Sequence, residues 1–154
     1  FEDWQEHQLR GWLYWAPHPR WAFSVDYIYD HWRNEDPPPL ATDFPQEVVT
    51  HRVPVAAHWF HPSGLFAELR ATGLLQDVDR VPGAPIADGT EETVLLDAAL
   101  GYRLPGRRGI VSLEANNLLD TRFDYQDSNF QSSQTSTPLY LPERTVLVRA
   151  TLQF

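Results

Sequence analysis

The chain has 154 residues, of which 21 are acidic and 12 basic, and its formal net charge of -9 argues against a nucleic-acid partner. It contains no cysteine, which excludes disulfide bonds and thiol chemistry. No stretch approaches the roughly 18 consecutive apolar residues of a membrane-spanning helix. The chain opens with Phe1-Glu2-Asp3-Trp4, without a methionine or a signal-peptide pattern, so we expect a processed or excised piece. The length predicts one unit over residues 1–154.

Apolar and polar residues alternate along most of the chain, and this period of two predicts strands with one apolar face. In chain order we expect seven strands at residues 7–16, 21–32, 48–60, 65–76, 92–104, 110–117 and 144–154. Several of these stretches reach about 10 to 13 residues, which exceeds the usual strand length of roughly 5 to 6. The length is near the ~9–11 residues that cross a bilayer at a tilt.

The connections between these stretches alternate between short and long. The short ones carry Pro17, Pro62 and Pro105, and the long ones cover 33–47, 77–91 and 121–138. Membrane barrels have tight turns on the periplasmic side and long loops outside, whereas soluble sandwiches mix loop lengths at both ends. We therefore predict an up-and-down antiparallel meander, with the three long segments at one end and the proline turns at the other.

The two faces of the predicted strands differ in charge. One face is almost uncharged, and its aromatic residues fall mainly near strand ends, as in an interface girdle: Trp15, Trp21, Tyr29, Trp59 and Tyr102. The other face carries both signs of charge, which suits a wet lumen: Asp26, Arg52, Glu68, Arg70, Asp97, Arg103, Glu114 and Arg149. The alternative is a soluble sheet whose apolar side covers a core, because periodicity alone does not tell which side is inside.

The last stretch, 144–154, alternates most strictly. Its apolar face carries Val146, Val148, Ala150, Leu152 and Phe154, and only Leu147 breaks the polar side. A strand that finishes on an aromatic residue is typical of the end of an outer-membrane barrel, where that residue sits at the interface girdle.

Seven strands in a meander leave the first and the last running in the same direction, whereas bacterial single-chain barrels pair antiparallel throughout and use an even number. We therefore expect two open edges and no ladder between 7–16 and 144–154. In lipid each unsatisfied backbone group costs several kcal/mol. An upstream part of the same polypeptide, or another chain, is expected to cover the edges.

Two stretches resemble a known family. Val111-Ser112-Leu113-Glu114-Ala115-Asn116-Asn117-Leu118-Leu119-Asp120-Thr121-Arg122-Phe123-Asp124-Tyr125 is similar to the penultimate-strand motif of TonB-dependent outer-membrane receptors, in which apolar alternation runs into Asn-Leu-(Phe/Leu)-Asp. Pro142-Glu143-Arg144-Thr145 and the run to Phe154 resemble the last strand of that family, which more often has glycine where Glu143 stands. The two stretches cover roughly the last third of the chain.

The resemblance implies the C-terminal part of a 22-stranded transmembrane barrel in the outer membrane of a bacterial cell. It implies the wall of a transporter that takes up a siderophore-, cofactor- or sugar-like ligand, without the plug domain or the TonB-contacting segment. The implied partners are outer-membrane lipid, the upstream remainder of the barrel, and the barrel-assembly machinery, which would recognise the C-terminal strand as an assembly signal. An outer-membrane export porin and a soluble ligand-binding β-barrel are the alternatives.

Catalytic and metal sites find little support in the sequence. His58 and His61 are three residues apart, but on a strand and its turn they diverge instead of converging on a metal. Ser24, Asp30 and His31 offer the groups of a hydrolase, yet no nucleophile motif surrounds them. We therefore expect no catalytic residue, no metal and no cofactor.

Overall fold

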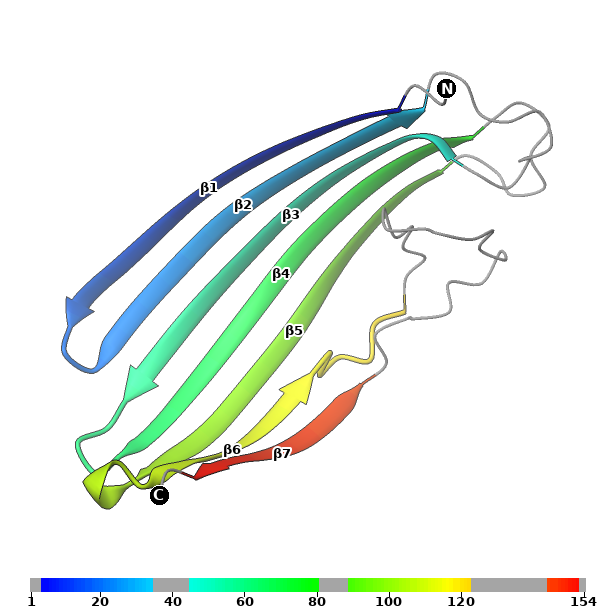
Figure 1. Cartoon of the computed structure of the whole chain (residues 1–154). Coiled ribbons are helices and arrows are strands. Elements are labelled where there is room, and N and C mark those ends of the chain that lie inside the picture. Colours follow the sequence, from blue (N-terminus) through cyan, green and yellow to red (C-terminus); the bar gives the residue numbers. More distant parts are fainter. Residues whose placement is uncertain (1–3, 35–44, 81–88, 123–143, 153–154) are drawn as a thin grey trace.

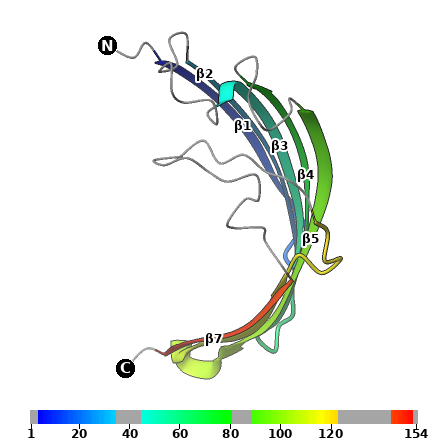
Figure 2. The same cartoon turned by 90° about the vertical axis from the view of Figure 1, so that its right-hand side faces the viewer.

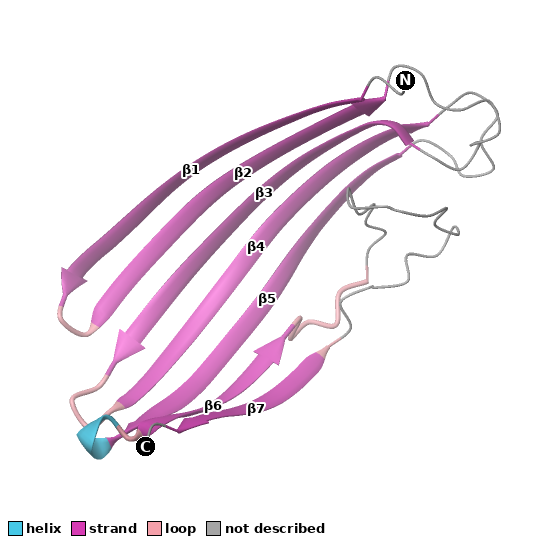
Figure 3. Ribbon diagram, in the orientation of Figure 1, coloured by secondary structure: helices cyan, strands magenta, loops and turns pink. Residues whose placement is uncertain are grey.

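The computed structural model describes residues 4–34, 45–80, 89–122 and 144–152 (Figure 1). Within these ranges the chain is all-β, apart from one short 3₁₀ helix (Figure 3). The elements are β1 (Trp4–His18), β2 (Trp21–Asn34), β3 (Pro45–Phe60), β4 (Leu65–Arg80), β5 (Gly89–Leu104), η1 (Pro105–Arg107), β6 (Gly109–Asn116) and β7 (Thr145–Leu152). The prediction of seven strands is confirmed. No helix in these ranges has the length and apolar character that a membrane crossing requires.

The strands form one antiparallel sheet in which each strand pairs with its neighbours in sequence, in the order β1-β2-β3-β4-β5-β6-β7. β1 and β7 are therefore the two edges, and within the described ranges no ladder joins them. The sheet is curved but open (Figure 2). The predicted meander with two separate edges is confirmed.

The strands β1 to β5 have 14 to 16 residues and run beyond the predicted ends. β4 shows the reason. Its apolar alternation stops at Leu75, but the backbone ladder continues through Asp77, opposite Val49, and Asp79, opposite Glu47. Apolar periodicity marks only the part of a strand that faces an apolar medium, whereas backbone pairing extends further.

The turn between β3 and β4 is fixed by a glycine and by backbone hydrogen bonds. Gly64 has φ +100°, and its N–H donates to the carbonyl of His61 at 3.0 Å. A Cβ at this position would lie 2.7 Å from the carbonyl oxygen of Arg103, whose own N–H donates to Gly64. Only glycine fits this left-handed, crowded site without strain. The turn thus links β3–β4 to β5.

The ends of β1 to β5 that carry the first two long connections lie together, opposite the short turns. Trp4 pairs with Asn34 and Val78 with Gly89, so these ends share one side of the sheet (Figure 1). They agree with the predicted placement of 33–47 and 77–91. The ladder between β5 and β6 ends where Ala115 pairs with Ala98, in the middle of β5, so the strand ends beside 121–138 lie apart from the others. Most of these three segments, namely 35–44, 81–88 and 123–143, lies outside the described residues.

The described part of the chain is a single layer, and its buried core is small. Trp32, Val48 and Val78 form the one apolar cluster found among the described buried residues. Buried Gln76 donates to the hydroxyl of buried Thr50 at 2.9 Å on the same side of the sheet. No described element covers the opposite, apolar side, so most large apolar side chains remain exposed.

Candidate functional site

The side of the sheet that we call the concave face is hollowed and polar. Its larger hollow has a volume of about 680 Å³ and spans β1 to β5, with Asp26, Arg52, Arg70 and Asp97 in its lining. A second hollow extends it over β6 and β7 and shares Arg70 and Asp97. The two hollows form one trough across the sheet, lined by charges of both signs.

Ion pairs join neighbouring strands across this trough. The guanidinium of Arg149 on β7 lies 3.0 Å from the carboxylate of Glu114 on β6. Glu68 on β4 pairs with the imidazole of His58 on β3 at 3.4 Å, and also with Arg70 of its own strand at 2.8 Å. Because these side chains are partly exposed, each pair contributes little to stability. Their main effect is to line the face with fixed donors and acceptors.

The carboxylates of Asp26 and Asp97 differ in their hydrogen-bond partners. One oxygen of Asp97 accepts a hydrogen bond of 2.8 Å from the backbone N–H of Asn117. The Oδ1 atom of Asp26 is buried without a hydrogen-bond partner in the structure, and Arg10 approaches it only to 3.7 Å. Among the described side chains, the other buried oxygen without a hydrogen-bond partner is Oγ1 of Thr93.

Arg103 contacts aromatic rings. Its guanidinium carbon lies 5.4 Å from the ring centroid of Phe60 and 5.8 Å from that of Phe66, which are cation–π distances. The Phe66 ring occupies the space over Gly101, where a Cβ would clash with it. Gly101 therefore keeps the Phe66 ring, and with it Arg103, against the sheet.

All eight polar residues predicted for one face share the concave face by register. Seven of them line the two hollows: Asp26, Arg52, Glu68, Arg70, Asp97, Glu114 and Arg149. Arg103 lies beside the short turns instead. The alternation also places Trp12 and Tyr14 on this face, with Arg10, and the structure has them there, 65% and 66% exposed.

The opposite side, the convex face, carries the predicted girdle residues. Trp15, Trp21, Trp59 and Tyr102 all lie near the short turns, and the Phe23 ring lies between Trp15, at 5.7 Å, and Trp21, at 6.1 Å. The fifth girdle residue, Tyr29, lies further inside its strand than expected, because β2 continues to Asn34. Tyr29 is thus separated from the other four by the length of an apolar stretch.

Between these aromatic residues the convex face is apolar and open, and we call this region the apolar band. On β4 it runs from Leu65 to Leu75 and on β5 from Val94 to Tyr102, and no charged residue occurs on this face within those stretches. Its larger side chains are well exposed: Leu13 66%, Leu69 51%, Val94 54%, Leu100 55% and Val148 75%. On the convex face of β4 and β5, the first charged residues beyond these stretches are Asp77 and Glu92.

The last strand contributes to the same band. Val146, Val148, Ala150 and Leu152 of β7 share the convex face and are exposed, as their alternation predicted. Phe154, the fifth residue of the predicted assembly signal, lies outside the described residues.

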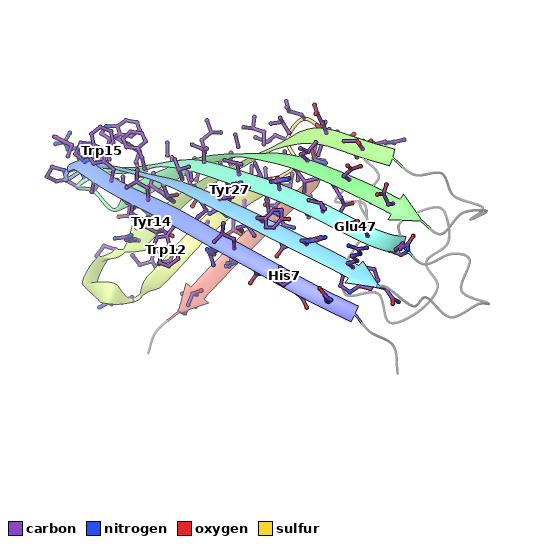
Figure 4. All side chains as sticks on the ribbon, turned by 90° about the horizontal axis from the view of Figure 1, so that it is seen from above. His7, Trp12, Tyr14, Trp15, Tyr27 and Glu47 are labelled. Atoms are coloured by element: carbon purple, nitrogen blue, oxygen red, sulfur yellow. The ribbon has the colours of Figure 1, made fainter. Side chains whose placement is uncertain are left out.

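A row of rings crosses three strands at the far edge of the apolar band. His7 on β1 faces His31 on β2, with ring centroids 6.1 Å apart, and Tyr29 lies 6.3 Å from His31 and 5.1 Å from His51 on β3. The hydroxyl of Tyr27 is hydrogen-bonded to Nδ1 of His51 at 2.9 Å. We call these five residues the His–Tyr row. In Figure 4, His7 lies toward the long connections and Trp15 at the opposite end.

The motif after β6 forms a locked corner. Asn117, with φ 49°, is buried, and its side chain bonds the backbone of Thr121 twice, donating at 2.9 Å and accepting at 3.0 Å. The N–H of Leu118 donates to the carbonyl of Leu96 at 2.7 Å, which fastens the corner to β5. Asparagine suits position 117 of the Asn-Asn-Leu-Leu-Asp stretch, because it tolerates a positive φ and its side chain bonds the neighbouring backbone.

The histidines considered for a metal point apart. His58 stacks on Phe60 on the concave face, whereas the His61 ring lies 5.6 Å from that of Trp59 on the convex side. In the described ranges no three His, Asp or Glu side chains gather closely enough to hold a metal ion. His31 likewise lies on the convex face, while Ser24 and Asp30 share the concave one.

Sequence reasoning missed the His–Tyr row because its members are far apart along the chain. His7, His31 and His51 become neighbours only through the β1–β2–β3 register. The spacing of 24 residues between His7 and His31 carries no signal by itself. Aligning the predicted strands by their turns would have placed these residues in adjacent positions.

Comparison with known proteins gives no further assignment. No family model, no curated protein and no solved structure matches this chain.

Proposed function

We propose that this chain is a wall segment of an outer-membrane β-barrel, with its convex face against lipid and its concave face toward a polar lumen. The observation that carries the proposal is the exposed apolar band. A soluble sheet buries its apolar side against a second layer, and the described residues provide none. Lipid is the environment in which such a face is stable without a covering layer.

The dimensions of the band support a membrane. From Leu65 to Leu75 on β4 there are ten residue steps, which at about 3.3 Å per residue give about 33 Å along the strand. A strand tilted by about 45° would then cross about 23 Å, close to the ~25 Å apolar band of outer-membrane barrels. The remaining residues of β4, up to Arg80, would extend beyond the lipid on the side of the long connections.

The concave face supports a wet interior. Its trough carries Arg52, Arg70, Asp97 and Glu114. Charges of both signs close together remain solvated and attract polar solutes, as expected in a barrel lumen.

The transporter class is proposed from the resemblance of residues 111–125 and 142–154 to TonB-dependent receptors. We propose uptake of a siderophore-, cofactor- or sugar-like ligand, without catalysis. In this proposal the locked corner at Asn117 fixes where the chain leaves β6. The upstream remainder of the barrel and the barrel-assembly machinery are the protein partners.

The proposal is tested by insertion of the chain into lipid. The chain is diluted from denaturant into buffer, into detergent, and into phosphatidylcholine vesicles. We expect a blue-shifted tryptophan emission and β-sheet circular dichroism only with detergent or vesicles, with quenching by brominated acyl chains. A monodisperse, folded chain in plain buffer would overturn the proposal and support a soluble ligand-binding fold.

A further inference from the structure

We propose that the His–Tyr row is a docking surface for the phosphate of anionic phospholipid headgroups, and this rests on the proposed membrane location. The row consists of His7, His31, His51, Tyr27 and Tyr29, all on the convex face. Imidazole and phenol rings combine an apolar body with a polar tip, which suits the boundary between acyl chains and headgroups. Tyr27 and His31 already bond His51 and Glu47, so the donors for a phosphate oxygen come from His7, Tyr29 and Nε2 of His51.

The position of the row matches the boundary of the apolar band. His51 pairs with Leu75, the last apolar residue on the convex face of β4, and Leu75 pairs with Glu92, where charge begins on β5. The row therefore lies at the level where the lipid-facing surface changes from apolar to polar. The tryptophans at the opposite edge of the band would mark the other interface, so the two edges differ in chemistry.

The fixed charges around the row are mostly acidic, so protonation of the histidines decides whether this part of the face is anionic or neutral. On β2 and β3 the neighbours on this face are Arg33 and Glu47, whose formal charges cancel, and Glu47 lies 2.6 Å from Nε2 of His31. On β1 the next position on this face is Gln5, which is neutral. On β4 and β5 this face carries Asp77 opposite Val49, Asp79 opposite Glu47, and Glu92 opposite Leu75. The formal charges of Arg33, Glu47 and these three acidic residues sum to -3 with neutral imidazoles and to zero with all three imidazoles protonated.

This arrangement predicts a dependence on both lipid charge and pH. Acidic solution protonates imidazole and adds positive charge to it. A basic side chain near an anionic surface contributes about 1 kcal/mol of binding, or about fivefold in affinity. We therefore expect the chain to bind phosphatidylglycerol-containing vesicles more tightly at about pH 5.5 than at about pH 7.5, by about fivefold for each imidazole that becomes charged.

The test compares partitioning of the full chain into phosphatidylcholine vesicles with and without phosphatidylglycerol, at both pH values, by tryptophan emission. The triple variant His7→Gln, His31→Gln, His51→Gln should lose the gain that phosphatidylglycerol gives at low pH. The matched control His58→Gln lies on β3 as well, but on the concave face, and should keep it. The single variant His51→Gln should lose part of the gain, and circular dichroism checks that each variant folds.

The outcomes separate this inference from the proposed function. A gain that survives in the triple variant, or a chain that inserts equally into both vesicle types at both pH values, overturns the headgroup site and leaves the membrane wall intact. The opposite result has three parts: the chain does not enter pure phosphatidylcholine vesicles, it binds phosphatidylglycerol at low pH, and the triple variant loses that binding. This result supports the headgroup site and overturns the proposed membrane-wall function.

Discussion

Two adjacent leucines on β5 allow a direct test of which face meets lipid. Leu96 lies on the convex face opposite Ala71, near the middle of the apolar band, whereas Leu95 lines the trough on the concave face. Substituting each by arginine introduces the same side chain into the same strand, one residue apart. Any difference between Leu96→Arg and Leu95→Arg therefore reports the environment of the two faces.

The expected costs follow from the environment. An arginine on the lipid face of a barrel costs about 2–4 kcal/mol near the midplane. At Leu95 the new guanidinium would lie in the polar trough, beside Asp97 of the same face, where substitution should cost less than about 1 kcal/mol. The free energy of unfolding of the vesicle-inserted chain, measured by urea titration with tryptophan fluorescence, gives both numbers.

Two outcomes would contradict lipid contact of the convex face. Equal losses at the two positions, or a larger loss at Leu95, would mean that the convex face is not in contact with lipid. The same measurement in detergent micelles should preserve the order of the two variants, since the micelle interior is also apolar.

Further outcomes follow from the turns, the corner and the edges. Gly64→Ala should lower the free energy of unfolding by at least about 1–2 kcal/mol, because the residue has φ +100° and a crowded Cβ position. The control Gly73→Ala should change it by less than about 0.5 kcal/mol, because a Cβ at residue 73 meets open space. Asn117→Ala should cost about 2–4 kcal/mol through loss of two buried side-chain hydrogen bonds, and the exposed Asn116→Ala far less; equal losses would contradict the locked corner. Cysteines placed in the middle of β1 and β7 should form no intramolecular disulfide in the isolated chain, as non-reducing electrophoresis would show, because the two strands are opposite edges of an open sheet.

The sequence predicted those parts of the fold that depend on local alternation. Strand number, strand order and the assignment of residues such as Arg70 and Leu69 to opposite faces all follow from a period of two. The C-terminal end of β4 was placed too early, because Asp77 and Asp79 break the apolar pattern while their backbone still pairs with β3. A rule based on side chains detects where the apolar environment ends, not where the ladder ends.

The candidate sites were predictable to a lesser extent, because they depend on register. The seven charged residues of the trough and Arg103 were all assigned to the correct face, since each alternates with apolar neighbours on its own strand. The partners within the trough, such as His58 with Glu68 or Arg149 with Glu114, appear only when strands are aligned. The His–Tyr row is an extreme case, because His7 and His51 contribute to one surface from two strands that do not touch each other in the sheet.

The geometry of the edges limits how the proposed barrel could be completed. β1 and β7 run in the same direction, so they cannot close antiparallel on each other, and their lengths of 15 and 8 residues do not match. Adding an odd number of strands to seven gives an even total, in which the first and last strands are antiparallel neighbours. A 22-stranded transporter barrel would need 22 − 7 = 15 further strands, which is odd. The long free edge of β1 and the short one of β7 then predict partner strands of different length. Whether they belong to the same polypeptide or to another chain, those strands must pair each unsatisfied N–H and C=O, at a saving of several kcal/mol per group in lipid.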